Sequence, residues 1–276
     1  MDWLTEPFSY DFMQRALLAG ILAVATTSVV GTWVIIRGLA FMGDALAHGI
    51  LPGVAIALLL DVNPVIGAAA AAIVMIGAIS LIHRTTRLSE DTAIGLLFVG
   101  MLAVGVIVIS RSGSFAVDLV AILFGDVLGT TTGDLVVQAV AAGIVTGGVV
   151  AFYRPLMALS FNEAKAEALG LRPRLAHLVM MTLITVAVVA SFQAVGALLV
   201  FGLLVAPPAT AVLVAHRVPV VMVAAALIGA VEVLAGLIIS FHFDTAAGAT
   251  MSGLAVAVFF VVLLIRRLRN RPLPTR

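Results

Sequence analysis

Long apolar runs alternate with short polar connections along almost the whole chain. About 20 apolar residues are needed to cross the hydrocarbon core of a bilayer as a helix, and the runs have this length. The pattern predicts eight or nine spans, because the first two runs share a short connection and their bounds are open. The runs are 14–36, 39–60, 63–82, 92–110, 134–153, 174–192, 195–215, 219–240 and 246–265.

The stretch 111–133 differs from these runs, because Gly, Ser, Thr and Asp interrupt it. Its apolar core, 119–124, is too short to span a bilayer. We expect a half-helix or a re-entrant piece here, which is stable at membrane depth only where protein or water covers its backbone.

Composition sharpens this picture. The chain has 276 residues, of which 63% are hydrophobic and 11% charged, and its mean hydropathy is +1.24. Such values are typical of an all-α polytopic membrane protein, and we expect one transmembrane domain over residues 1–276. No polar stretch is long enough for a soluble catalytic domain. Cysteine is absent, which excludes disulfides and thiolate metal sites.

The basic residues predict an orientation. Cytoplasmic loops of membrane proteins are enriched in Lys and Arg. With nine alternating spans, Arg15 and Arg111 fall on one side and the other 13 of the 15 basic residues on the opposite side. We therefore expect an outside N-terminus and a cytoplasmic C-terminus in a plasma or inner membrane. The 13 are Arg37, Arg84, Arg87, Arg154, Lys165, Arg172, Arg174, Arg217, Arg266, Arg267, Arg269, Arg271 and Arg276.

The second run contains the most informative polar residues. Asp44 and His48 are four residues apart, so a helix places them on one face. Ionisable residues at membrane depth are costly and mark functional sites, and a carboxylate with an imidazole is a ligand set for Zn²⁺, Mn²⁺ or Fe²⁺. Pro52 would bend the helix and remove the hydrogen bond to the carbonyl of His48. The alternative is a buried pair that only bonds neighbouring helices.

Further ionisable residues are candidates for weaker reasons. Glu232 lies past the middle of the eighth run, among Val, Leu, Ala and Gly. It is open whether it serves as a third metal ligand, a gate, a proton-bearing group or a structural hydrogen-bond partner. His242 and Asp244 lie near the outer end of the same span. They are either a transient outer metal site or residues that solvate a helix end.

Two prolines, Pro207 and Pro208, lie within the seventh run. Proline removes a backbone donor and kinks a helix. We interpret both residues as a structural kink in a packing helix and not as ligands.

The largest predicted cytoplasmic connection reads as a short helix. Asn162 has the properties of an N-cap, Glu163 suits the first turn, and Gly170 is a C-terminal stop. This connection is either a solvated linker or the surface to which a soluble partner protein that drives transport binds. Its residues are Asn162, Glu163, Ala164, Lys165, Ala166, Glu167, Ala168, Leu169 and Gly170.

Together these stretches resemble the ABC-3 family, the membrane permeases of ABC transporters for zinc, manganese and iron(II). The resemblance extends from about residue 10 to residue 265. It is carried by Met42-Gly-Asp-Ala-Leu-Ala-His48 with Leu51-Pro-Gly53, by Leu123-Phe-Gly125, by the Glu-Ala-rich loop that ends at Gly170, by Gly196-Ala-Leu-Leu-Val200 and by Ala206-Pro-Pro-Ala-Thr-Ala211. Pro208 stands where alanine is expected.

The resemblance implies a permease subunit with the fold of a type II ABC importer. Two copies would form the translocation path as a homodimer within membrane lipid, above a cytoplasmic ABC ATPase dimer and below an extracytoplasmic metal-binding protein. The family's metal-path Asp and His map onto Asp44 and His48, and its coupling helix onto about 162–171. The cargo would be Mn²⁺ or Zn²⁺, or else Fe²⁺, with no permanently bound cofactor and no nucleic-acid partner. ATP hydrolysis belongs to the partner, because this chain has no Walker-type glycine loop.

Other functions remain as alternatives. An ABC permease for a metal chelate such as haem or a siderophore would not need a buried Asp–His pair. An ion-coupled secondary transporter would use Asp44 or Glu232 as its carrier and would leave the 162–171 helix without a role. An intramembrane metalloenzyme would show a His-Glu-x-x-His helix or an equivalent ligand set, and the sequence has no such motif.

Overall fold

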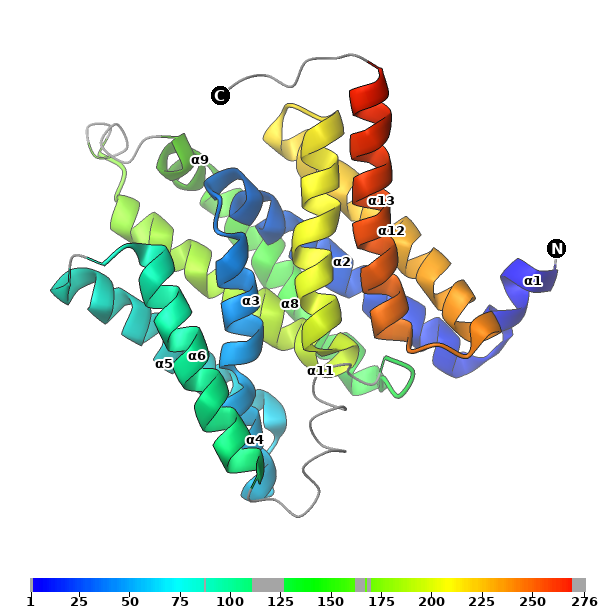
Figure 1. Ribbon diagram of the computed structural model, residues 1–276, viewed down its shortest axis with the longest axis horizontal. Coiled ribbons are helices and arrows are strands. Elements are labelled where there is room, and N and C mark those ends of the chain that lie inside the picture. Colours follow the sequence, from blue (N-terminus) through cyan, green and yellow to red (C-terminus); the bar gives the residue numbers. More distant parts are fainter. Residues whose placement is uncertain (1, 87, 111–126, 162–166, 168–169, 270–276) are drawn as a thin grey trace.

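The computed structural model describes residues 2–86, 88–110, 127–161, 167 and 170–269. These residues form helices and no strands, which confirms the predicted all-α class (Figure 1). The elements are α1 (Asp2–Thr5), the 3₁₀ helix η1 (Glu6–Ser9), α2 (Asp11–Arg37), α3 (Ala40–Gly49), α4 (Leu51–Leu59), α5 (Pro64–Thr85), α6 (Glu90–Ser110), α8 (Thr132–Ala151), α9 (Tyr153–Phe161), α11 (Pro173–Val214), α12 (Val218–Phe243) and α13 (Ala247–Leu268).

The described helices agree with the predicted eight or nine spans. Eight segments are long and apolar enough to cross a membrane, with α3 and α4 together counted as one. The shorter apolar helix Leu199–Val214 corresponds to the seventh predicted run. The eight segments are Asp11–Arg37, Ala40–Leu59, Pro64–Ile82, Thr92–Ser110, Thr132–Ala151, Pro173–Phe192, Val218–Phe243 and Ala247–Leu268.

The sixth and seventh runs are joined at Gly196, inside α11. This residue has φ 75° and ψ 162°, a backbone conformation that is essentially restricted to glycine. The sequence pattern placed the boundary at 193–194, because hydropathy does not report backbone dihedrals. Pro207 and Pro208 lie inside the second half of α11. The residue with non-helical dihedrals in α11 is Gly196, which precedes both prolines.

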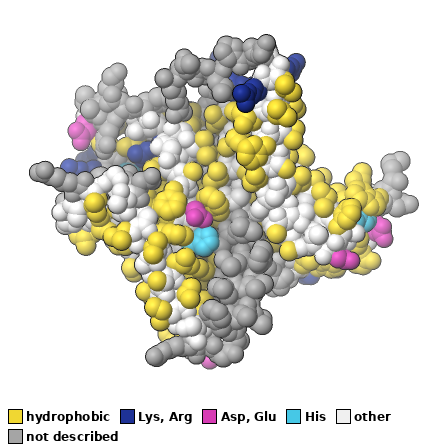
Figure 2. Space-filling view, in the orientation of Figure 1, with side chains coloured by type: hydrophobic (Ala, Val, Ile, Leu, Met, Phe, Trp, Pro, Cys, Tyr) yellow, Lys and Arg dark blue, Asp and Glu magenta, His cyan; other side chains and the backbone are white. Residues whose placement is uncertain are grey.

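Helix α2 lies at the centre of the bundle and packs against α8, α11 and α12. In the most apolar part of α2, 67% of the residues are buried, whereas in that of α13 only 22% are buried. Large aliphatic side chains are exposed on the peripheral helices, and Figure 2 shows a largely hydrophobic face. This distribution suits lipid contact, since lipid tails are as apolar as leucine.

A close backbone approach holds α2 against α11. A Cβ atom on Gly31 would lie 2.0 Å from the carbonyl oxygen of Leu204, so only glycine fits at this point. Pro208 follows Leu204 by four residues and has no N–H to bond that carbonyl within the helix. The freed oxygen therefore faces the neighbouring helix.

Candidate metal site

The second span is interrupted beside the Asp–His pair. Helix α3 ends at Gly49 and α4 begins at Leu51, with Ile50 between them. Pro52 lies in the first turn of α4, where a missing N–H is tolerated. The amide of Ile50 donates to the carbonyl of His48. The sequence predicted a bend at Pro52, whereas the helix is interrupted at Ile50, two residues earlier.

Asp44 fixes the orientation of the His48 ring. The Nδ1 atom of His48 lies 3.2 Å from Oδ1 of Asp44 and 3.1 Å from the backbone oxygen of Asp44. Both oxygens can only accept, so Nδ1 carries the proton and donates. In the neutral imidazole this tautomer leaves the lone pair of Nε2 for another partner. A hydrogen-bonded carboxylate is the usual support for a metal-ligating histidine.

The pair is accessible but lies in apolar surroundings. The side chain of His48 is 22% exposed and that of Asp44 is 26% exposed. Phe98 of α6 packs edge-on against the His48 ring, with centroids 5.7 Å apart and an interplanar angle of 82°. Phe41 packs in turn against Phe98. An incoming cation would therefore meet a polar pair set in an aromatic and aliphatic wall.

The other acidic and histidine candidates do not join this pair. Within the described part of the chain, no group of three His, Cys, Asp or Glu side chains could hold a metal ion. The structure therefore brings together two candidate metal ligands at this point, and Glu232, His242 and Asp244 do not join them.

Glu232 lies in the protein core. It is 1% exposed on α12, which packs against α2, α11 and α13. Neither carboxylate oxygen has a hydrogen-bond partner. The sequence singled out Glu232 as a costly residue in an apolar run, and within the described structure no group donates a hydrogen bond to its carboxylate.

His242 is engaged by the N-terminal segment. Its ring stacks on Trp3 with centroids 4.3 Å apart, and its Nε2 atom lies 2.8 Å from the carbonyl oxygen of Trp3. Asp244 caps α12 in the left-handed conformation, with φ 50°. Sequence reasoning missed Trp3, because no local pattern links residues at opposite ends of the chain.

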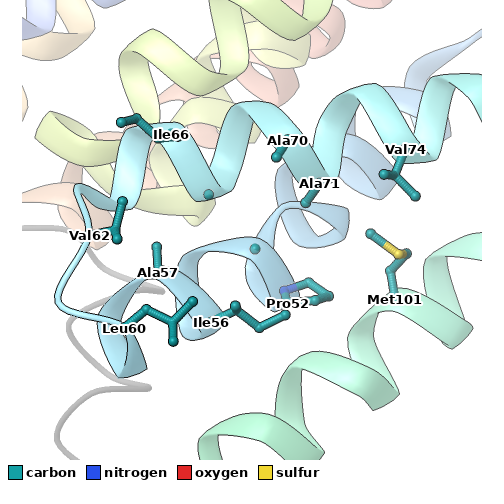
Figure 3. Close-up of a pocket in the computed structure, with 12 residues that line it drawn as sticks. Pro52, Ile56, Ala57, Leu60, Val62, Ile66, Ala70, Ala71, Val74 and Met101 are labelled. Carbon is teal, nitrogen blue, oxygen red and sulfur yellow. The ribbon is translucent and has the colours of Figure 1, made fainter.

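An apolar cavity lies next to the interrupted span. It has a volume of about 380 Å³ and lies between α4 and α5, with Met101 of α6 at one end (Figure 3). Pro52 and Gly53 contribute to its wall from α4. The lining is apolar throughout, so this cavity offers no ligands for a metal ion.

Two predicted features lie largely outside the described residues. These are the half-helix core at 119–124 and most of the connection at 162–169. At the end of that connection, the amide of Gly170 donates to the carbonyl of Glu167 over 2.9 Å. Gly170 has φ 72°, the left-handed conformation that ends many helices.

Comparison with known proteins identifies the family. The model of the ABC 3 transport family matches residues 9–266. The chain belongs to this family. It is similar to the manganese transport system membrane protein MntC of Listeria monocytogenes, with 38% identity over 96% of this chain and 94% of the relative. A probable iron transport system membrane protein of Haemophilus influenzae is 31% identical over 98% and 99% of the two chains.

A solved structure has the same fold. PsaBC from Streptococcus pneumoniae, in complex with a Fab, matches with a TM-score of 0.85 and 30% identity. The match covers 98% of this chain and 99% of the other. The fold and family expected from the sequence are thus confirmed.

Proposed function

We propose that this protein is the membrane permease of an ATP-driven importer of divalent transition metal ions, with Mn²⁺ as the first candidate and Fe²⁺ as the second. The observation that carries the proposal is the partly exposed Asp44–His48 pair on an interrupted membrane helix. The similarity to a manganese permease and an iron permease supports the choice of metals. Zinc remains a third cargo that the ligand chemistry allows.

The pair suits a transient site. Asp44 supplies negative charge and orients His48, whose Nε2 atom binds the ion. One imidazole nitrogen supported by a carboxylate holds a divalent ion less firmly than a closed cage, and conduction needs a site that also releases its ion. A second copy of the chain would bring a second pair to the same path. Metal selection would then follow from ligand type and geometry rather than from raw affinity.

The partners follow from the family and from the charge pattern. Basic residues stand at the end of α2 (Arg37), at the start of α12 (Arg217) and at the end of α13 (Arg266 and Arg267). In Figure 2 most basic side chains lie toward the top, where α13 ends in Figure 1. We assign this side to the cytoplasm, with the N-terminus outside. The ATPase dimer would dock there on residues 162–170, and a metal-binding protein would deliver the ion from the opposite side.

The test is metal uptake by cells that lack their own importer. The cells would express this chain with its candidate ATPase as wild type, Asp44→Asn and His48→Gln, and manganese, iron and zinc would be measured by elemental analysis. Both substitutions keep a side chain of similar size; the first removes the negative charge and the second removes the imidazole nitrogen. We expect uptake of one metal to fall to background in both variants, and that metal identifies the cargo.

Asp61→Asn is the matched control. Asp61 is exposed and lies between α4 and α5 with φ 53°, a conformation that asparagine also tolerates. This variant loses the same charge and should take up metal normally. Membrane levels of every variant would be measured by immunoblot. Wild-type uptake in Asp44→Asn and His48→Gln would refute the assigned metal path and make the pair structural.

A further inference from the structure

Glu232 is a buried acid without a partner. It lies near the middle of α12, is 1% exposed, and has no hydrogen bond at either carboxylate oxygen. Removing an ionised carboxylate from water is expensive unless another group compensates its charge. Groups on the neighbouring helices therefore determine whether the Glu232 side chain is buried as an ionised carboxylate or as a neutral carboxylic acid.

Close contacts on either side of Glu232 involve α2, α11 and α13. A Cβ atom on Gly229 would lie 2.8 Å from Val24 of α2 and 3.2 Å from Pro207 of α11, and one on Gly236 would lie 2.4 Å from Met251 of α13. Residues 229, 232 and 236 share one helix face, because they are spaced by three and four. The Glu232 side chain thus leaves α12 between its contacts with Pro207 and Met251.

Among the described residues, no charged group on the packed helices forms an ion pair with Glu232. On α2, Arg15 lies five residues before Gly20, which meets Val233, and no ion pair joins Arg15 to Glu232 among the described contacts. The other titratable groups lie near helix ends. They are Asp11 and Arg37 of α2, Arg174 and His177 of α11, Arg266 and Arg267 of α13, and His242 of α12 itself.

An acceptor is available on α11. Pro207 has no N–H, so the carbonyl of Leu203, four residues earlier, lacks its intrahelical donor. The second half of α11 and α12 are joined by the short segment 215–217 and run in opposite directions. Leu203 precedes Pro207 by about one turn and Glu232 follows Gly229 by about one turn, so both lie within about one turn of the Pro207–Gly229 contact. Helical side chains also lean toward the N-terminus of their helix, which directs the carboxyl group back toward this contact.

We propose that Glu232 binds a proton and, as a neutral carboxylic acid, donates a hydrogen bond to the freed carbonyl of Leu203. One hydrogen bond then satisfies the buried carboxyl group of Glu232 and a carbonyl that lacks the donor four residues later in its helix. This proton site is separate from the Asp44–His48 pair, and it does not depend on the identity of the transported metal.

Infrared spectroscopy of the purified protein tests the proposal at neutral pH, where exposed carboxylates are ionised. Wild type minus Glu232→Gln should show the C=O stretching band of one protonated carboxyl group. Wild type labelled with ¹³C in its glutamate carboxyl groups is a second test that needs no variant, and the same band should shift to lower frequency. An absent band, or a band that the label does not move, would overturn the proposal.

Two proline variants test the acceptor. Pro207→Ala restores an N–H that can bond the Leu203 carbonyl, so the Glu232 band should move toward the frequency of a free acid. Pro208→Ala is the matched control, because it restores a donor for Leu204, whose carbonyl faces Gly31, and it should leave the band unchanged. A band that both variants shift equally, or that neither shifts, would refute Leu203 as the acceptor. These measurements involve no metal and no ATPase, so they are independent of the proposed transport function.

Discussion

Gly53 of α4 and Gly67 of α5 each occupy the space where the other's side chain would begin. A Cβ atom on Gly53 would lie 2.0 Å from the carbonyl oxygen of Gly67, and one on Gly67 would lie 2.1 Å from that of Gly53. The two backbones therefore touch at a reciprocal glycine contact. This contact fixes α5 against the half-span that follows the Asp44–His48 pair.

Gly53→Ala and Gly67→Ala should each destabilise the protein, because the added methyl group meets backbone rather than a flexible side chain. We expect a loss of about 1–3 kcal/mol or more, as for overpacked cores, visible as a lower midpoint of thermal unfolding in detergent. Gly77→Ala on the same helix α5 is the control, since nothing lies within 4 Å of its Cβ position. Equal stability of all three variants would contradict the contact.

Gly196→Ala should destabilise the turn inside α11. Its φ of 75° and ψ of 162° are unfavourable for any residue with a side chain, at about 1–3 kcal/mol. Gly253→Ala in α13 serves for comparison, because that glycine is helical and its Cβ position is open. Chemical denaturation followed by circular dichroism would measure the difference, and an unchanged midpoint for Gly196→Ala would show that the turn adopts another conformation.

Phe98→Leu should weaken metal uptake without abolishing it. Phe98 packs edge-on against His48, and aromatic pairs are worth about 0.5–1.5 kcal/mol beyond their buried area. Loss of this packing frees the imidazole, so we expect a rise of about two- to tenfold in the metal concentration for half-maximal uptake. Phe260→Leu on α13, an exposed ring that packs against Phe259, should have no effect. An equal effect of both variants would exclude a positioning role for Phe98.

The Trp3–His242 contact can be followed by fluorescence. The chain has two tryptophans, so Trp33→Phe leaves Trp3 as the single tryptophan. In that background, His242→Ala removes the stacked ring, and Trp3 should show red-shifted emission and stronger quenching by acrylamide. His216→Ala, between α11 and α12, should change neither quantity. No response to His242→Ala would indicate that the N-terminal segment is held by other contacts.

The sequence predicted those properties that depend on neighbouring residues. Hydropathy over about 20 residues indicates a membrane span wherever the helix packs. The approach of Asp44 to His48 is also local, because one helical turn places residues four apart on the same face. Glu232 was identified as exceptional for a similar reason, since a single acid within an apolar run is costly in any arrangement of helices.

Only the tertiary structure decided how these helices meet. The break at Gly196 depends on backbone dihedrals that hydropathy does not encode, and the Gly53–Gly67 contact depends on the packing of α4 against α5. Pairs such as Trp3 and His242 are distant along the chain, so no periodicity relates them. Burial of Glu232 follows from the packing of α12 against three helices. In physical terms, helix formation is governed by local hydrogen bonds and hydropathy, whereas the partners of each helix face are fixed by close packing between residues remote in sequence.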